Sequence, residues 1–288
     1  MNHAKQARLW EIDSMRGVVI ITMTIFHLMW NLYTFRVLPD VVLWAGFWKY
    51  FQRFTACTFI FLVGVSLTIS YRRAMQKAAE RQTDTQSPTG DIHTNAPSLF
   101  SKFLMRGFRV FGLGMIITIV VSVAGMGYVH FGVLHLIGFA IVAAYPFLSF
   151  KWSNLALWAI FQVAGNFLQL VRFQSIGLFW QATGEPGLQV TNIEAVWFSW
   201  LGLIPTQYFP NDYFPIVPWF GVVLLGVFVG NTFYDEQGRK FLLPDFSNIY
   251  PIRFLRFLGR NSLLIYMIHQ PILFVLLALL GIIDVGLY

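Results

Sequence analysis

Seven long apolar runs constrain the fold of this chain more than any other feature. A helix needs about 20 consecutive apolar residues to cross a bilayer. Runs of about this length occupy residues 17–35, 51–71, 104–124, 130–149, 154–171, 215–233 and 261–283. The chain is 57% hydrophobic and only 11% charged, whereas soluble domains carry about 25% charged residues. We therefore predict an all-α polytopic membrane protein with about seven transmembrane helices in one domain, residues 1–288.

The basic residues predict how this bundle is oriented. Lys and Arg in short connections favour the cytoplasm. With the N-terminus in the cytoplasm, the outer connections contain only four of the 20 basic residues, namely Arg36, Lys49, Arg53 and Arg172. We therefore predict a cytoplasmic N-terminus, an outer C-terminus and a multi-pass protein of the cell inner membrane. Topology accounts for the net charge of +7, so nucleic acid is not a predicted partner.

Two connections differ from tight turns. Residues 72–101 include "AAERQTDTQSPTGDIHTNAPS", a polar stretch without aromatic residues, which predicts a cytoplasmic and partly disordered linker. Residues 172–214 form a long outer connection that contains "NIEAVWFSWLGLIP". This apolar stretch is too short to span, so it predicts an interfacial or re-entrant helix.

Three histidines lie inside predicted spans: His27 in "IITMTIFHLMWNL", His135 in "HFGVLHLIG" and His269 in "IYMIHQPIL". At about 1.5 Å per helical residue, all three fall in one central layer of the bilayer. Ionisable groups at this depth are costly and usually serve a function. No Asp or Glu lies deep in a predicted span, so histidine is the side chain that can transfer protons there near neutral pH. The alternative is that each imidazole only hydrogen-bonds a neighbouring helix.

Two amide side chains lie close to these histidines in the sequence. Asn31 follows His27 by four residues and lies on the same helix face, and Gln270 adjoins His269. The single cysteine, Cys57, excludes an intramolecular disulfide and is interpreted as a small buried apolar side chain. No metal site is predicted, because no helix carries spaced His, Glu or Asp ligands.

Five segments in order resemble one known family. They are "EIDSMRGVVIITMTIFHLMW", "FIFLVGVSLTIS", "FGVLHLIG", "DYFPIVPWFGVVLLGVFVG" and "LGRNSLLIYMIHQPIL". The chain is similar over nearly its whole length to small bacterial relatives of heparan-α-glucosaminide N-acetyltransferase, in the transmembrane acyltransferase superfamily. The resemblance implies transfer of an acyl group, usually acetyl, from cytoplasmic acyl-CoA to an acceptor on the outer side, typically a sugar. The implied partners are the lipid bilayer, acyl-CoA as co-substrate, and a glycan or amino sugar.

On this resemblance, His27 is the candidate general base that removes a proton from the acceptor. His135 or His269 would polarise the thioester carbonyl or orient His27, and a covalent acetyl-imidazole stays open. Candidates for acceptor contact or orientation are Asn31, Gln52, Arg53 and Gln270. Candidates for the phosphates of CoA are Arg16, Arg72, Arg73, Arg106, Arg109, Arg253, Arg256 and Arg260. The alternative for each arginine is that it only follows the positive-inside rule.

Two other classes of function remain open at this point. The histidines could line the pathway of a proton-coupled carrier or flippase, or the chain could be a structural partner of another membrane protein. Transfer of label from acetyl-CoA to a sugar panel separates these alternatives. The acceptor, the acyl chain and a homo-oligomeric state are not determined by the sequence.

Overall fold

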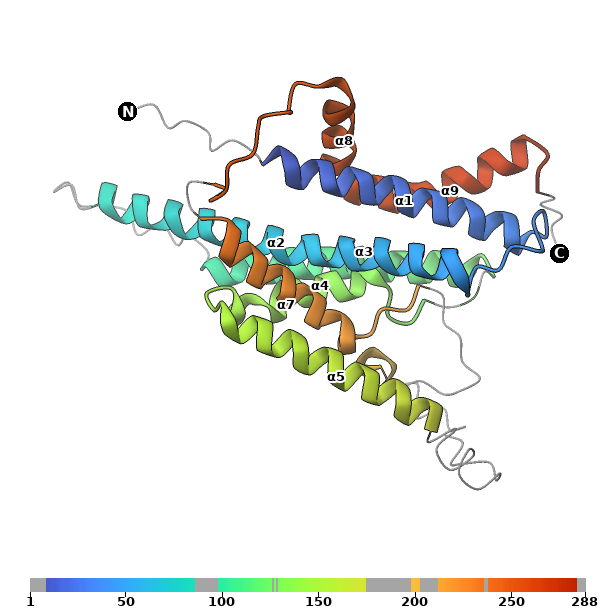
Figure 1. Ribbon diagram of the computed structural model, residues 1–288, viewed down its shortest axis with the longest axis horizontal. Coiled ribbons are helices and arrows are strands. Elements are labelled where there is room, and N and C mark those ends of the chain that lie inside the picture. Colours follow the sequence, from blue (N-terminus) through green and yellow to red (C-terminus); the bar gives the residue numbers. More distant parts are fainter. Residues whose placement is uncertain are drawn as a thin grey trace. The chain divides into compact units, whose positions relative to one another are not determined.

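The computed structural model describes residues 9–85, 98–125, 127, 129–174, 198–202, 212–235 and 238–283. Within these residues the regular elements are helices (Figure 1). They are α1 (Trp10–Thr34), α2 (Gly46–Thr85), α3 (Leu99–Val123), α4 (Val133–Ala143), the short 3₁₀ helix η1 (Tyr145–Phe147), α5 (Trp152–Gln174), α7 (Ile216–Phe233), α8 (Tyr250–Arg260) and α9 (Ser262–Leu279). The prediction of an all-α protein is confirmed.

Five of these helices are long and apolar enough to cross a membrane: α1, α2 as far as Glu80, α3, α7 and α9. They confirm the prediction of a polytopic membrane protein. The predicted span 130–149 is not one continuous helix, since α4 has only 11 residues and η1 follows it. Pro146 accounts for this break, because it has no N–H to donate to the Val142 carbonyl and its ring would clash with that carbonyl in a continuing α-helix. The 23-residue α5 is not among the five, so the count of seven spans stays a prediction.

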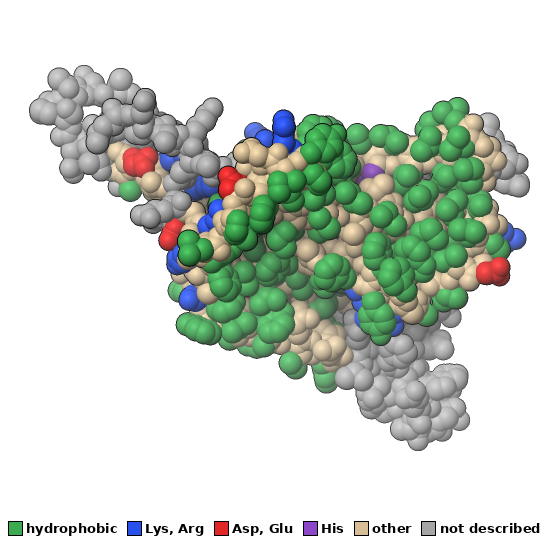
Figure 2. Space-filling model, turned by 45° about the horizontal axis from the view of Figure 1, so that its top comes forward, with side chains coloured by type: hydrophobic (Ala, Val, Ile, Leu, Met, Phe, Trp, Pro, Cys, Tyr) green, Lys and Arg blue, Asp and Glu red, His purple; other side chains and the backbone are tan. Residues whose placement is uncertain are grey.

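Apolar side chains on the outside of the helices agree with a membrane environment. Val123 is 83% exposed, Leu279 81% and Phe54 70%. Figure 2 shows hydrophobic side chains over much of the visible face. Soluble monomers rarely expose apolar patches larger than a few hundred Å², so this surface is suited to lipid.

The chain divides into two compact units, which are described separately. The first unit contains residues 1–62 and 237–288. Here α1 lies beside α8 and α9 (Figure 1). Gly17 of α1 faces the backbone of Leu255, and Gly259 of α8 faces the backbone of Asp13. A Cβ atom at either glycine would overlap those backbone atoms, so the close approach of α1 and α8 depends on residues without side chains.

The second unit contains residues 63–236. In it α3 packs on α4, and α5 packs on α7 (Figure 1). Gly107 of α3 and Gly138 of α4 meet at the first contact, where a Cβ on Gly107 would lie 2.8 Å from the Gly138 carbonyl oxygen. Small residues permit close helix packing in membranes, where the hydrophobic effect does not hold helices together.

The two unusual connections are only partly described. Helix α2 continues to Thr85, so the first part of the predicted linker is helical. Residues 86–97 lie outside the described residues, and their disorder stays a prediction. In the predicted outer loop, α5 extends to Gln174 and a 3₁₀ turn covers residues 198–201. Much of "NIEAVWFSWLGLIP" lies outside the described residues, so the interfacial helix also stays a prediction.

Candidate active site

Two of the three predicted histidines lie together in the first unit. His27 comes from the middle of α1 and His269 from α9, and their ring centroids are 4.7 Å apart with an interplanar angle of 71°. His269 is 8% exposed and His27 is half-buried. Two imidazoles from helices at opposite ends of the sequence therefore share one site.

The hydrogen bonds of these rings define their tautomers. His27 Nδ1 is 3.0 Å from the carbonyl oxygen of Met23, and His269 Nδ1 is 2.7 Å from that of Tyr266. A carbonyl oxygen can only accept, so Nδ1 of each ring carries the proton and donates it. In the neutral form, Nε2 of each ring then carries a lone pair. Each histidine is thus held as a base at Nε2 by its own helix.

An amide pair lies next to the two histidines. Gln270 Nε2 donates a hydrogen bond to Asn31 Oδ1 at 2.7 Å, and Asn31 is fully buried. Asn31 Nδ2 and Gln270 Oε1 are also buried, and neither has a hydrogen-bond partner among the described residues. Leaving a buried polar group without a partner costs about 1–3 kcal/mol. One donor and one acceptor in this cluster therefore have unused hydrogen-bonding capacity among the described residues.

Aromatic side chains support the histidine pair. Tyr266 lies 5.6 Å from His269 between ring centroids and stacks on Phe59 of α2 at 6.3 Å and 8°. Phe26 meets His27 edge to face at 6.0 Å. Rotamers held by such packing keep a site in a defined geometry. We call His27, His269, Asn31 and Gln270 the histidine–amide cluster.

His135 lies in the second unit and has the opposite tautomer. The backbone N–H of Gly132 donates to His135 Nδ1 at 3.1 Å, so the proton of the neutral ring is on Nε2. The ring is 2% exposed and packs between Phe111 and Phe131, at centroid distances of 4.9 and 5.8 Å. Nε2 is buried without a partner among the described residues. His135 caps the start of α4, and its Nε2 offers a hydrogen-bond donor rather than a base. This favours the alternative interpretation, in which the imidazole serves helix packing rather than catalysis.

A family model described as "Heparan-alpha-glucosaminide N-acetyltransferase, catalytic" matches residues 8–271. The chain belongs to this family. The match includes His27, His135, His269 and Gln270. Comparison with curated proteins and with solved structures gives no significant match to either. The family is one of N-acetyltransferases, so this heparan-α-glucosaminide N-acetyltransferase relative is a membrane transferase by membership.

Two residues predicted to contact the acceptor lie early in α2 of this N-acetyltransferase relative. Gln52 is half-buried and Arg53 is exposed. Neither makes a hydrogen bond with the histidine–amide cluster among the bonds seen between described residues. Their role stays a prediction.

The arginines predicted to meet CoA differ in the partners they already have. Arg16 and Arg260 both approach Asp13, with N···O distances of 3.9 and 3.3 Å. Arg256 Nη1 donates to the carbonyl of Ser247 at 2.9 Å. The side chains of Arg106, Arg109 and Arg253 are exposed and that of Arg73 is half-buried. Asp13 offsets the charge of its two partners, which makes Arg16 and Arg260 weaker candidates for binding an anion.

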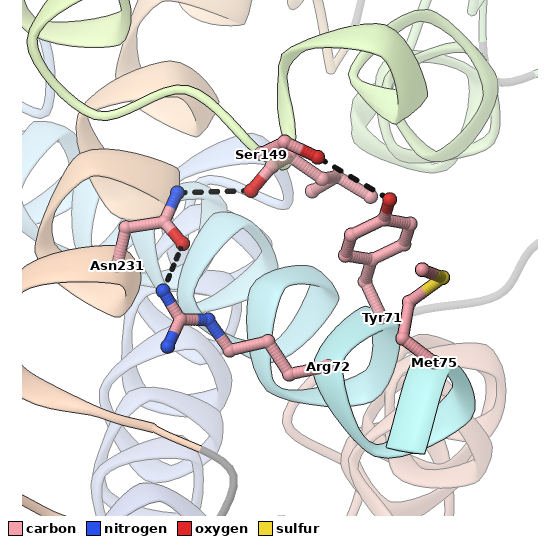
Figure 3. Close-up of a pocket in the computed structure, with 6 residues that line it drawn as sticks. Tyr71, Arg72, Met75, Ser149 and Asn231 are labelled. Carbon is pink, nitrogen blue, oxygen red and sulfur yellow. Dashed lines mark hydrogen bonds between the residues drawn. The ribbon is translucent and has the colours of Figure 1, made fainter. Parts of the chain in front are cut away.

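Arg72 is placed differently, because it lines a pocket with Asn231 of α7 (Figure 3). Asn231, Tyr71 and Ser149, which also line this pocket, were not among the predicted site residues. The sequence contained one indication of this site: Asn231 is a polar amide at the end of the otherwise apolar run "GVVLLGVFVGN". Polar residues in such runs usually face the interior of a bundle.

Proposed function

We propose that the chain is a membrane-embedded acyltransferase that moves an acetyl group from acyl-CoA to a sugar-type acceptor, with His27 as the general base. One observation carries this proposal. The Met23 carbonyl fixes the proton of His27 on Nδ1, so the Nε2 lone pair is available in a site that also contains His269. A base held in the correct tautomer by a backbone acceptor is what proton abstraction requires.

The proposed step balances with one proton, which His27 takes up and then gives back. Nε2 of His27 removes the proton from the hydroxyl or amine of the acceptor, whose oxygen or nitrogen then bonds to the thioester carbonyl carbon. The carbon–sulfur bond breaks, and the CoA sulfur leaves with the electron pair. The proton on His27 is then returned to that sulfur, so the products are the acetylated acceptor and free CoA thiol. A positioned base of this kind contributes about 10² to 10⁴ in rate.

The neighbours of His27 have supporting roles in this proposal. His269 presents a second lone pair in the same cluster, so it can hold the proton between its removal from the acceptor and its delivery to the CoA sulfur. Asn31 Nδ2 and Gln270 Oε1 would hydrogen-bond the acceptor, because both atoms are buried without a partner among the described residues. Asn31 and Gln270 therefore orient the acceptor, while His27 carries the chemistry.

The proposed sidedness rests on the basic residues of the inner connections and on the helices that hold the cluster. Both α1 and α9 are long and apolar enough to span, and the proposal places the cluster in their middle part, within reach of both compartments. Acyl-CoA would arrive from the basic cytoplasmic side and the acceptor from the outer side. The inner membrane is the proposed location.

The test is acetyl transfer by the purified full-length chain in lipid nanodiscs. Labelled acetyl-CoA is incubated with a panel of amino sugars and glycans, and both product label and released CoA thiol are measured. His27→Ala should lower transfer by about 10² to 10⁴. His130→Ala, which removes an exposed histidine of the connection before α4, is the matched control and should keep full activity.

Two results would contradict the proposal. A fully active His27→Ala protein removes His27 as the base. No transfer to any acceptor, together with no CoA binding by calorimetry, would favour the proton-coupled carrier, in which the same two imidazoles would relay protons along a pathway.

A further inference from the structure

A second polar site lies in the second unit. A pocket of about 240 Å³ is lined by Tyr71, Arg72, Met75, Leu148, Ser149 and Asn231. Figure 3 shows that Tyr71 and Arg72 come from one helix, α2, while Ser149 and Asn231 approach from two other parts of the chain. Ligand pockets for drug-sized molecules are about 300–1,000 Å³. This pocket therefore fits one small charged group rather than a whole co-substrate.

The guanidinium of Arg72 is held by a neutral partner. Its Nη2 donates to Asn231 Oδ1 at 2.8 Å. A guanidinium has five N–H donors, and this is the one hydrogen bond of Arg72 seen among the described residues. The three ion pairs found among those residues involve Arg16, Arg239 and Arg260, and none includes Arg72. Among the described residues, Arg72 is therefore held in position by a neutral group, and no carboxylate offsets its positive charge.

Asn231 is itself fixed by two carbonyl oxygens. Its Nδ2 donates to the carbonyls of Leu148 at 2.9 Å and Phe150 at 2.8 Å. Both amide hydrogens are then used, so Oδ1 must face Arg72, and the side chain is only 6% exposed. An Asp here would cancel the charge of Arg72 and oppose two carbonyl oxygens. Asn at this position holds a cation in place and leaves its charge available.

Two hydroxyls complete the pocket. Tyr71 Oη and Ser149 Oγ lie 3.3 Å apart (Figure 3), and each can donate to a ligand by rotating its hydrogen. A guanidinium with neighbouring hydroxyls is a donor set suited to phosphate oxygens, because charge-assisted hydrogen bonds to phosphate are stronger than neutral ones.

We infer that this pocket binds a phosphate group. Two sources share that chemistry: a phosphate of CoA, which rests on the proposed function, and the headgroup of an anionic phospholipid. A merely structural Arg72 would hold α2 to α7 through Asn231 and would have no effect on phosphate affinity. Binding of phosphate compounds therefore separates the two roles of Arg72.

The experiment measures binding to the full chain in nanodiscs of zwitterionic lipid. The nucleotide arm uses adenosine 3′,5′-bisphosphate and CoA in calorimetry. The lipid arm uses phosphatidylglycerol counted by native mass spectrometry. Arg72→Gln removes the charge, and Lys77→Gln removes a charge from an exposed site on the same helix as the matched control. We expect Arg72→Gln to weaken binding by about tenfold or more, and Lys77→Gln to leave it unchanged.

A second substitution keeps the test valid if Arg72→Gln does not fold. Ser149 is exposed, so Ser149→Asp should fold while placing a negative charge at the pocket. It should weaken phosphate binding as strongly as Arg72→Gln. The neutral Ser149→Asn, which replaces the hydroxyl by an amide donor without adding charge, should weaken it less than Ser149→Asp. Thermal unfolding in the same nanodiscs reports folding for each variant.

The arms also identify the source of the phosphate. Weakening confined to the nucleotide compounds assigns the pocket to acyl-CoA, and weakening confined to phosphatidylglycerol assigns it to lipid. Unchanged binding of both in Arg72→Gln or in Ser149→Asp, or no saturable binding by the unaltered chain, overturns the inference. His27→Ala should bind nucleotide normally, so a failure of acetyl transfer is distinguishable from a failure of this pocket.

Discussion

Gln270 donates a hydrogen bond to Asn31 at 2.7 Å. Gln270 is one residue after His269 in α9, and Asn31 is four residues after His27 in α1. The same alignment of α1 and α9 brings the two imidazole rings to 4.7 Å. Asn31 is fully buried. Sliding or rotating either helix would therefore break this hydrogen bond and leave buried polar atoms without a partner. The amide pair therefore sets the alignment on which the histidine pair depends.

We expect Asn31→Ala and Gln270→Ala to be coupled. Each single substitution leaves the other amide buried without its partner and should destabilise the protein by about 1–3 kcal/mol. The double substitution should cost less than the sum of the two, with a coupling of about 1 kcal/mol in a double-mutant cycle. Thermal unfolding in nanodiscs measures this. Additive effects would show that the hydrogen bond does not hold α1 to α9.

The proposed base predicts how acetyl transfer varies with pH. His27 can accept a proton only when Nε2 carries its lone pair, so activity should fall as the pH is lowered and the ring becomes protonated. The acidic limb of kcat/KM should disappear in His27→Ala, because the residual rate no longer depends on an imidazole. His130→Ala should keep that limb. An acidic limb that persists in His27→Ala would assign it to another group.

Glycine substitutions test the contact between α1 and α8. Gly17→Ala adds a Cβ that would overlap the backbone of Leu255. Such overpacking typically costs about 1–3 kcal/mol. Gly112→Ala in α3 is the matched control, because a Cβ there meets nothing within 4 Å. It should stabilise its helix by about 0.5–1 kcal/mol. Equal stability of the two variants would mean that α1 and α8 do not pack closely.

Asp245 provides a pH-dependent contribution to stability outside the spans. Hydrogen bonds from the backbone and side chain of Ser247 lower the pKa of the Asp245 carboxyl, and the backbone bond is 2.9 Å long. Its folded pKa lies below the unfolded value, so this contribution is present above the unfolded pKa and is lost as the pH falls through the folded pKa. Asp245→Asn should remove this part of the acid dependence of unfolding. A carboxyl that titrates at or above its ordinary pKa by NMR would contradict the prediction.

Helix type and many helix positions could be predicted from the sequence, because hydropathy is a local property. The runs that contain His27 and His269 became α1 and α9. The run from 130 to 149 shows the limit of this approach, since mean apolarity does not register the interruption at Pro146. Helix α2 is also longer than its apolar run, because its last turns are polar yet remain helical.

The candidate site was predictable in part. Spacing placed Asn31 on the face of His27, and both belong to the histidine–amide cluster. Spacing could not separate His135 from His27 and His269, because the difference is a tautomer set by the Gly132 backbone. It also could not single out Arg72 among the arginines, since the pocket depends on Asn231 and on two carbonyls from another segment.

The sequence by itself determined that this is a helical membrane protein of the N-acetyltransferase family, and that the side chains in the middle of its spans that can transfer protons near neutral pH are histidines. Local composition fixes the helical membrane character, because each helix satisfies its own backbone hydrogen bonds in lipid. The order of motifs along the chain carries the family. Only the tertiary structure decided that His27 meets His269 and that Arg72 meets Asn231. Such pairs depend on how each helix is rotated and which helices it contacts. Close packing at residues such as Gly17 and Gly259 sets these contacts, and hydropathy does not encode them.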